Sequence, residues 1–260
     1  MKALYTAATG MSAQQVKMDN IANNLANVAT SGFKKVRENF QDLYYQEMRS
    51  PGPNTAAGTQ DSTGVQVGHG VRLASLRRSF LQGNAEVTGN ATDLMIEGPG
   101  FFQVQLADGT IGYTRDGSFR LDSEGSLVTV DGATLIPGIS VPQGSTLSVG
   151  ADGILTATLE GEEAATELGQ IELAAFTNPA GLRSEGRNLF RATEASGDAL
   201  TGAPGDQGLG SVIQYALESS NVDVAEELVS LIQAQRSYEL VSKVIETSDE
   251  VLQTTNRIKK

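Results

Sequence analysis

Apolar residues recur every seven positions near the start of the chain. This first series consists of Leu4, Met11, Met18 and Leu25. A second row, three positions further on, contains Ala7, Ile21 and Val28 and is interrupted by Gln14. Alternating spacings of three and four are typical of one face of an α-helix. We therefore expect an amphipathic helix over most of the first thirty residues, ending at Thr30-Ser31-Gly32.

The C-terminal end repeats the same pattern over a longer stretch. Its heptad series is Val224, Leu231, Tyr238, Ile245 and Leu252, widened by Leu228, Ala234, Val241 and Val244. The pattern predicts one helix from about Asp223 to Ile258, roughly 50 Å long at 1.5 Å per residue. Asn221 or Asp223 can cap its start. The helix dipole favours the acidic residues near that start and the basic residues at the end, which are Glu226, Glu227, Arg257, Lys259 and Lys260.

Two interpretations of these terminal helices remain open. They can be core helices of one globular domain, or they can pair with each other and bury the remaining apolar surface against further copies. No comparable helical pattern lies between them, which favours the second interpretation. The expected helix-packing and assembly interface consists of Leu4, Met11, Met18, Ile21, Leu25, Val28, Val224, Leu228, Leu231, Tyr238, Val241, Ile245 and Leu252.

A group of asparagines stands out in the N-terminal helix: Asn20, Asn23, Asn24 and Asn27. Asparagine is a poor helix former. At 100° per residue these side chains lie about 130° round the helix from the apolar stripe. The group is either a solvated face or a second, amide-rich face that contacts a neighbouring subunit.

The segments that follow the first helix have other textures. Phe40, Leu43, Tyr44 and Met48 are spaced for a short amphipathic helix over about Arg37–Met48, which completes an N-terminal helical segment over 1–49. Ser50–Gly70 is rich in Gly, Pro, Ser, Thr and Asn, and it is expected to form a linker or an extended arm.

Short β-branched and aromatic runs alternate with turn signals over 71–214. Asp-Gly or Glu-Gly pairs occur at Asp108, Asp116, Glu124, Asp131 and Asp152. Asp-Gly between such runs predicts tight hairpins with type I′ turns. We expect an all-β domain here and a helical segment over 215–260 that pairs with the N-terminal helix. The overall class is α+β, with paired, coiled-coil-like terminal helices around a central all-β domain.

Composition excludes several kinds of chemistry. The 260 residues carry 31 acidic and 19 basic side chains, a net charge of −12, which argues against a nucleic-acid partner. With no cysteine and only His69, cysteine zinc sites and histidine clusters are excluded. No Walker, nucleophile-elbow or calcium-loop motif is present. Paired carboxylates could serve a glycosidase, but the chain has no Trp. We expect no catalytic, metal or cofactor site.

Three segments carry a family resemblance. The N-terminal run from Ile21 to Lys34 resembles a signature of bacterial flagellar rod and hook proteins, and the run from Ser220 to Glu239 resembles that family's C-terminal signature. Gly98–Val104, followed by Tyr113–Phe119, is similar to the family's β-domain. The three segments occur in the family's order. Length and the arm resemble the distal-rod members most, with the proximal-rod members as the alternative; 71–214 is too short for the hook protein.

The resemblance implies a function and partners. Paired terminal helices would form the inner layer of a tubular homopolymer, the stiff shaft that carries torque from motor to hook. The implied partners are further copies of the chain, proximal rod proteins, the hook protein, periplasmic and outer-membrane ring proteins, and the flagellar type III export apparatus. This export route fits the absence of a recognisable signal peptide or membrane span in the sequence, and it implies a place in the basal body within the periplasmic space. A secreted β-domain binding module is the alternative of another class.

A physical hypothesis follows for the free subunit. Its terminal stripes should not be buried by its own chain, so both ends are expected to stay largely disordered until neighbours cover them. Ordering costs about 1–2 kcal/mol per residue, so only a well-matched seat at the growing tip would offset it. The arm is the candidate stiffener of the assembly.

Overall fold

The computed structural model describes residues 2–49, 64–159, 165–206 and 208–258. The chain forms two compact units. Unit 1 consists of Met1–Leu25, Val36–Arg77 and Asp223–Lys260, and unit 2 consists of Ala26–Lys35 and Arg78–Val222. The expected α+β class is confirmed: an N-terminal helix, a central β-rich region and a C-terminal helix.

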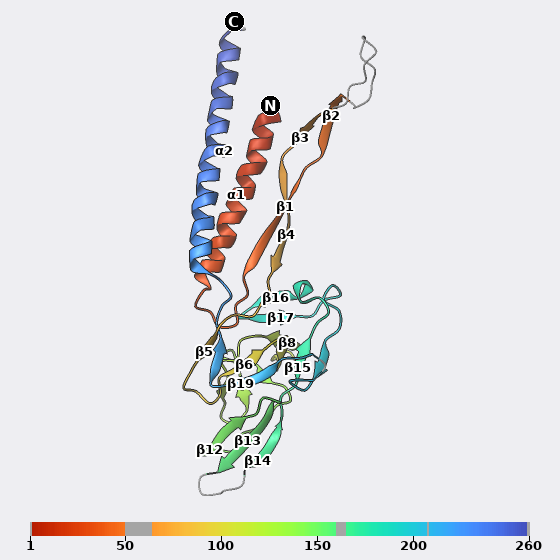
Figure 1. Cartoon of the computed structure of the whole chain (residues 1–260), viewed down its shortest axis with the longest axis vertical. Helices are drawn as coiled ribbons and strands as arrows, with labels where there is room; N and C mark the ends of the chain where they lie inside the picture. Colours follow the sequence, from red (N-terminus) through yellow and green to blue (C-terminus); the bar gives the residue numbers. More distant parts are fainter. Residues whose placement is uncertain (1, 50–63, 160–164, 207, 259–260) are drawn as a thin grey trace. The chain divides into compact units, whose positions relative to one another are not determined.

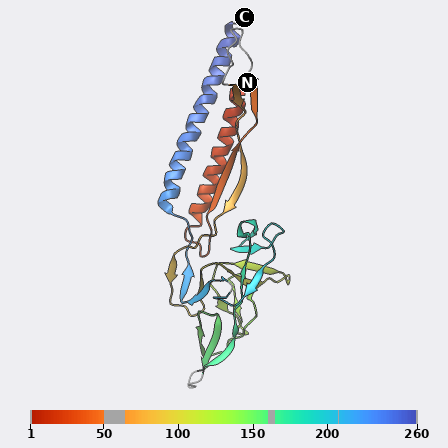
Figure 2. The same ribbon diagram turned by 45° about the vertical axis from the view of Figure 1, so that its right-hand side comes forward.

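Unit 1 contains both long helices. Helix α1 spans Lys2–Ala26 and α2 spans Val224–Ile258. They lie side by side in two views (Figures 1 and 2). A Cβ built on Gly10 of α1 would lie 3.9 Å from a methyl carbon of Val241 on α2, so the backbone of α1 closely approaches α2. Neither helix of the described chain is apolar over a stretch long enough to cross a membrane.

The start of α2 follows the capping expectation. The Asp223 carboxylate accepts hydrogen bonds from the N–H groups of Ala225 (2.8 Å) and Glu226 (3.1 Å). These two donors have no partner within the helix, so the side chain satisfies them. Asp223 is therefore the cap, while Asn221 has other partners in unit 2.

The expected helix over Arg37–Met48 is wrong. Strand β1 (Val36–Asp42) pairs with β4 (Val71–Arg78), and β2 (Tyr45–Arg49) pairs antiparallel with β3 (Val65–Gly68). A bond from Leu43 N–H to the Gly70 carbonyl (2.8 Å) continues the pairing between the two ladders, which together form the β-ribbon. In the first five residues of β1, every second side chain is less exposed than its neighbours, as in a strand with one face covered. The helical spacing of the apolar residues therefore did not determine the local structure. The expected arm thus contains β3, while 50–63 lies outside the described residues.

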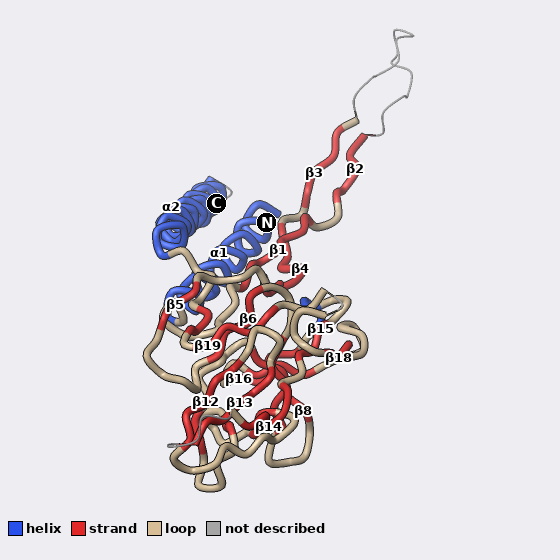
Figure 3. Tube along the Cα trace, turned by 60° about the horizontal axis from the view of Figure 1, so that its bottom comes forward, coloured by secondary structure: helices blue, strands red, loops and turns tan. Residues whose placement is uncertain are grey.

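Unit 2 is built from short strands (Figure 3). Its described residues form a nine-stranded sheet, a three-stranded sheet β12-β13-β14, and the pairs β6–β19 and β5–β20. Within the large sheet, the order β16-β17-β8-β7-β11-β10-β9 is joined by β15 and β18. The first strands are β5 (Ala85–Val87), β6 (Leu94–Glu97), β7 (Phe101–Gln105), β8 (Ile111–Thr114), β9 (Arg120–Leu121), β10 (Leu127–Val128) and β11 (Thr134–Leu135). The others are β12 (Ser145–Val149), β13 (Ile154–Leu159), β14 (Thr166–Gln170), β15 (Leu173–Ala175), β16 (Arg183–Gly186), β17 (Leu189–Arg191), β18 (Leu200–Gly202), β19 (Ser211–Gln214) and β20 (Ala216–Glu218), with a 3₁₀ turn, η1, at Pro179–Gly181.

Two hydrophobic clusters form the core of unit 2. The larger is mainly aliphatic, with Phe102 and Phe119 among its members, and it centres on residues with no exposed surface such as Leu94, Leu155 and Leu173. The smaller is aromatic and contains Phe101, Tyr113, Phe176 and Phe190. Tyr113 and Phe176 pack edge to face, with ring centroids 4.8 Å apart.

Most hairpins form at the positions that the sequence predicted, but their turns are not of the predicted type I′. The pairs at Asp108, Glu124, Asp131 and Asp152 each lie between two antiparallel neighbours, whereas Asp116-Gly117 does not close a hairpin. In the four hairpins only the glycine has positive φ, so the turns are not type I′. The turn between β16 and β17 has positive φ at both central residues, Arg187 (52°) and Asn188 (58°).

The border between the units differs from the expected one. The sequence placed the start of the β domain at Val71, but Val36–Arg77 groups with the helices. The segment Ala26–Lys35, expected to belong to the helical part, groups with the β unit. Helix α1 ends at Ala26, so Asn27 and Val28 are not helical, and Val28 cannot extend the stripe of α1.

Candidate functional site

Most residues of the expected packing interface are at least partly shielded within the chain. Ile21 is 2% exposed, and Ala234, which widens the heptad series of α2, is 1% exposed. The other expected residues that are at least partly shielded within the chain are Leu4, Met11, Met18, Leu25, Leu231, Tyr238, Val241 and Ile245. Val224, Leu228 and Leu252 are exposed instead. Whether the two helices form coiled-coil packing stays a prediction.

A second apolar stripe on α2 was missed by the sequence interpretation. Val229, Leu240 and Val251 are 55%, 70% and 64% exposed. They are eleven residues apart, which is three turns of helix, so they lie in one row. Val244 and Ile258 lie near the same row and are also exposed. We call these five residues the outer stripe; it lies about 120° round α2 from Glu227 and Ala234. Val244 was expected in the heptad series, and the spacing of eleven between Val229, Leu240 and Val251 is not part of that pattern.

Two of the four asparagines are used within unit 1. The Asn24 side chain accepts from Val36 N–H (3.0 Å) and donates to the Val36 carbonyl (2.9 Å). Asn20 donates to the same carbonyl (2.9 Å) and to the Glu38 carboxylate (2.6 Å). Both residues are buried, so their amides hold the start of β1 against α1. Asn23 is exposed, and a contact of Asn23 or Asn27 with a neighbouring subunit stays a prediction.

Further contacts join α1 to the β-ribbon. Lys2 donates to the Gln46 side chain, and the Thr9 hydroxyl accepts from Val71 N–H (3.4 Å). A Cβ on Gly70 would lie 2.2 Å from that hydroxyl oxygen, so only glycine fits there. With Asn20 and Asn24, these residues form one polar row on α1, because all of them fall within about 60° of one another round the helix.

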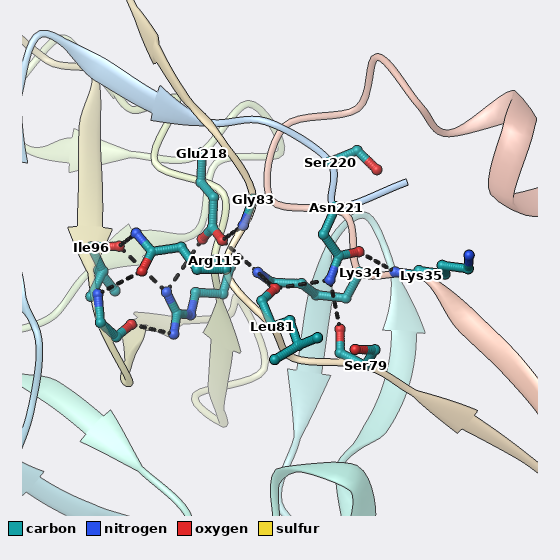
Figure 4. Close-up of polar contacts among 12 residues, drawn as sticks. Lys34, Lys35, Ser79, Leu81, Gly83, Ile96, Arg115, Glu218, Ser220 and Asn221 are labelled. Carbon is teal, nitrogen blue, oxygen red and sulfur yellow. Dashed lines mark hydrogen bonds and ion pairs between the residues drawn. The ribbon is translucent and has the colours of Figure 1, made fainter. Parts of the chain in front are cut away.

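Unit 2 contains a buried network of charges (Figure 4). The Glu218 carboxylate lies 2.5 Å from Lys34 Nζ and 3.3 Å from Arg115 Nη1, and it accepts from Gly83 N–H (2.8 Å). The side chains of Lys34 and Glu218 have no exposed surface, and that of Arg115 is 4% exposed. Lys34 also donates to the carbonyl of Leu81 (2.8 Å), and Arg115 donates to that of Gly98 (2.7 Å), while the buried Nε of Arg115 has no partner among the described residues.

Burial governs the ionisation of these cations. Desolvation lowers the pKa of the Lys34 ammonium, while the charge of Glu218 raises it in part. Desolvation likewise lowers the pKa of the Arg115 guanidinium, opposed by Glu218. Glu218 is therefore the counter-charge on which both buried cations depend.

The network fastens residues 26–35 to the end of the β unit. Gly32 N–H donates to the Glu218 carbonyl (2.7 Å), and Lys35 N–H donates to the Asn221 side chain (2.7 Å). Asn221 in turn donates to the carbonyls of Ser79 (3.0 Å) and Leu81 (2.8 Å), as Figure 4 shows. No sequence pattern singled out Glu218, because one buried charge among 31 acidic residues has no periodic signal.

Among the described residues, no group of three or more His, Cys, Asp or Glu side chains could hold a metal ion. The described residues form two other kinds of feature. The outer stripe is an exposed apolar surface, and its contact with water is unfavourable. The side-chain amides and the buried charges hold segments of the chain in position.

Comparison with known proteins shows which family the chain resembles. Family models match at 4–34 ("Flagella basal body rod protein"), 95–157 ("Flagellar hook protein FlgE/F/G D1 domain") and 213–258 ("Flagellar basal body rod FlgEFG protein C-terminal"). The chain is 48% identical to the flagellar basal-body rod protein FlgG of Buchnera aphidicola subsp. Schizaphis graminum, covering 98% of each chain. It is 46% identical to FlgG of Borreliella burgdorferi, covering 100% of this chain and 99% of that one. The chain belongs to the flagellar basal-body rod protein family.

Two relatives from one organism separate the branches of the rod family. This rod protein is 44% identical to FlgG of Caulobacter vibrioides over the full length of both chains. It is 33% identical to FlgF of the same bacterium, covering 96% of this chain and 94% of that one. This rod protein is thus most like the FlgG branch, and it is a structural protein and not an enzyme.

The matched segments coincide with the sites described above. The match over 4–34 contains Asn20, Asn24 and Lys34, and the match over 213–258 contains Glu218 and the outer stripe of the rod protein. The N-terminal signature seen in the sequence is divided between two structural tasks. Its Asn24 fixes the start of the ribbon in unit 1, and Gly32 and Lys34 fix the end of unit 2.

Proposed function

We propose that the chain is a structural subunit of the flagellar basal-body distal rod, and that it polymerises into a stiff tube transmitting torque from motor to hook. The observation that carries this proposal is the outer stripe of α2, which the chain itself leaves exposed. The full-length likeness to FlgG proteins supports the distal rod as the place of assembly.

A second copy of the chain is the occupant of the outer stripe in this proposal. Burying apolar surface contributes about 25 cal/mol per Å², so a row of exposed valines and leucine favours association. The facing sides of α1 and α2 would form each subunit's own pair, and the outer stripes would join pairs in neighbouring subunits. Val224, Leu228 and Leu252, expected in the assembly interface, are also exposed, but they lie on other faces of α2 than the outer stripe and would need a separate contact.

The remaining partners and the route to them belong to this proposal. Proximal rod proteins would lie below the subunit, the hook protein above it, and periplasmic and outer-membrane ring proteins around it. The subunit would reach the periplasmic space through the flagellar type III export apparatus, without a cleaved signal peptide. We propose the arm as the stiffener; its inner end, β3, already pairs with β2.

Placing a charge on the outer stripe tests assembly directly. Leu240→Asp should abolish polymerisation, seen by sedimentation and electron microscopy, and should abolish swimming when it replaces the chromosomal copy. Because Leu240 is 70% exposed, the melting temperature of the monomer should not change. Gln235→Asp adds the same charge to the exposed surface of α2 outside the stripe and should assemble normally. Normal motility of the Leu240→Asp strain would contradict the proposal.

A deletion tests the arm separately. A chain lacking 50–63 should still form tubes, but these should bend more, measured as a shorter persistence length in electron micrographs. Tubes as stiff as those of the full chain would remove the arm from the mechanism and would leave the role of the outer stripe intact.

A further inference from the structure

Four Asp-Gly pairs occur in the chain, all of them in unit 2, and no step of the proposed function uses them. They begin at Asp108, Asp116, Asp131 and Asp152. In such a pair the glycine nitrogen can attack the side-chain carboxyl carbon of the aspartate, because glycine has no side chain to obstruct a five-membered ring. A folded chain permits this attack only where the backbone around the glycine has room to move and the carboxyl group is free to turn.

Two of the four pairs are held by close packing. A Cβ built on Gly117 would lie 1.6 Å from the Leu94 carbonyl oxygen. A Cβ built on Gly153 would lie 2.6 Å from a ring carbon of Pro204. Backbone packed this closely cannot change its path without displacing neighbouring atoms, which is costly in a densely packed interior. The pairs at 116 and 152 therefore lack the room that ring closure needs.

Two carboxylates are held by hydrogen bonds. Asp108 accepts from the N–H (2.9 Å) and the hydroxyl (2.5 Å) of Thr110. These bonds lower the pKa of the Asp108 carboxyl, and the ionised form is the weaker electrophile. Asp116 accepts two bonds from Ser118 (3.1 Å and 2.8 Å) and one from Asn188 (3.1 Å). The carboxyl groups at 108 and 116 are thus kept from turning toward the following nitrogen.

The pair Asp131-Gly132 meets both conditions. A Cβ built on Gly132 would meet no atom within 4 Å. Among the described residues, the polar contact of the Asp131 carboxylate is an ion pair with Arg187 Nε at 3.8 Å. The two side chains are 38% and 72% exposed, and an exposed ion pair of this kind contributes little. The carboxyl group is therefore free to turn, in contact with water.

The glycine nitrogens do not separate this pair from the two others that close hairpins. Gly132 N–H donates to the Thr129 carbonyl at 2.9 Å, and the N–H groups of Gly109 and Gly153 donate to carbonyls at the same distance. The difference in reactivity must come from the packing and from the carboxyl group.

We propose that Asp131-Gly132 is a site of spontaneous covalent modification, at which the aspartate is converted to isoaspartate through a succinimide. A bond forms between the Gly132 nitrogen and the carboxyl carbon of Asp131, a carboxyl C–O bond breaks, and the amide proton and the hydroxyl group leave as water. Water then adds to the main-chain carbonyl carbon of residue 131 and breaks its bond to the nitrogen. The net change is an isomerisation, and it needs no oxidant, reductant or cofactor. The proposal does not depend on the proposed function.

The product would alter the turn between β10 and β11. These strands are two residues long and pair at Val128 and Thr134. The turn is closed by bonds from Thr129 N–H to the Ala133 carbonyl (2.8 Å) and from Ala133 N–H to the Thr129 hydroxyl (3.1 Å). Isoaspartate adds one methylene to the main chain inside this turn, so both bonds lose their geometry. Because Ala133 and Leu135 are buried, the free energy of unfolding of unit 2 should fall.

The full chain itself is the test, since its four Asp-Gly pairs serve as controls for one another. The chain is stored at neutral pH, at a concentration too low for polymerisation, and isoaspartate is located by electron-transfer fragmentation of its peptides. Transfer of labelled methyl groups by an isoaspartyl methyltransferase gives the total. We expect at least about fivefold more isoaspartate at 131 than at 108, 116 or 152, the factor that corresponds to breaking one hydrogen bond of ordinary net strength.

Storage in guanidinium chloride separates the fold from the local sequence. In the unfolded chain the four pairs should react at similar rates, because the packing and the hydrogen bonds are gone. An equal yield at the four pairs in the folded chain would overturn the proposal. A lead of residue 131 that persists unchanged in the unfolded chain would also overturn it, since the structure would then not be the cause.

Two variants test the assignment and its physical cause. Asp131→Glu keeps the charge but would require a six-membered ring, so the signal at 131 should vanish, and the urea midpoint should hold during storage while that of the parent falls. Thr110→Ala removes one bond to Asp108, whose glycine is already unobstructed, and should raise isoaspartate at 108 without changing the yield at 131. An unchanged yield at 108, or an equal fall of the midpoint in Asp131→Glu and the parent, would contradict the proposal.

Discussion

Asn24 pairs with the backbone of Val36 as a neighbouring strand would. Its side-chain oxygen accepts from Val36 N–H at 3.0 Å, and its nitrogen donates to the Val36 carbonyl at 2.9 Å. The same nitrogen lies 3.4 Å from the Glu227 carboxylate on α2. One amide thus joins both helices to the first strand of the ribbon, a task that needs a donor and an acceptor in one side chain.

Asn24→Asp separates these two roles. The variant keeps the acceptor for Val36 N–H, loses the donor to the carbonyl, and places a second carboxylate beside buried Glu227. We expect a loss of about 1–3 kcal/mol in the free energy of unfolding of the helical unit at neutral pH. Like charges raise a carboxyl pKa, so the loss should shrink as the pH falls and one carboxyl binds a proton.

Circular dichroism at the helical band, recorded during thermal unfolding at several pH values, measures this effect. Asn23→Asp makes the same chemical change at an exposed position one residue away and should have a much smaller effect. Equal destabilisation by the two variants would show that Asn24 has no special role in positioning the ribbon.

Gly32→Ala should destabilise unit 2 severely. The new methyl would lie 2.6 Å from the Asp116 nitrogen and 2.7 Å from the Arg115 carbonyl carbon, in a backbone conformation that alanine disfavours. Gly132→Ala shares the unfavourable φ, at +83°, but its Cβ would meet nothing within 4 Å. The control should cost about 1 kcal/mol, and Gly32→Ala at least about twice as much, in urea unfolding. Similar midpoints would mean that the close approach at Gly32 relaxes freely.

Ionisation of Tyr113 in the aromatic cluster should lower the free energy of unfolding at alkaline pH. Burial raises the pKa of the Tyr113 phenol, so the folded chain holds this proton more tightly than the unfolded chain. The contribution is fully present below the ordinary tyrosine pKa of about 10 and is lost as the pH rises through the raised value. Urea midpoints between pH 9 and 11.5 should fall less steeply in Tyr113→Phe than in the parent. Parallel curves would exclude Tyr113 as the source.

The cap of α2 contributes to the helix through Asp223. Asp223→Ala removes the acceptor for two backbone N–H groups and should lower the stability of the helical unit by about 1 kcal/mol. Asp223→Asn retains a side-chain oxygen acceptor and should lose less than half of that, in the same thermal unfolding experiment. If Asp223→Asn loses more than half as much stability as Asp223→Ala, the negative charge at the start of the helix dipole contributes more than the capping hydrogen bonds.

Particular elements show how far sequence patterns reach. The bounds of α2 and its acidic start were predictable, because a heptad over five turns or more has few competing explanations. The helix expected at Arg37–Met48 was wrong because four apolar residues also fit an alternating pattern, and pairing with β4 and β3 decided between them. The asparagines were recognised as a group, but their partner, Val36, lies on a strand that the sequence interpretation had assigned to a helix.

The sequence by itself determined the two terminal helices, the β-rich centre, the positions of most hairpins and the family, since these depend on local spacing and on long ordered signatures. Tertiary structure alone decided that Ala26–Lys35 belongs to the β unit, that Lys34 and Arg115 share Glu218, and that Asn24 serves Val36. These relationships join residues far apart in the chain. Their free energy comes from burial and geometry, which no local pattern of residue types encodes.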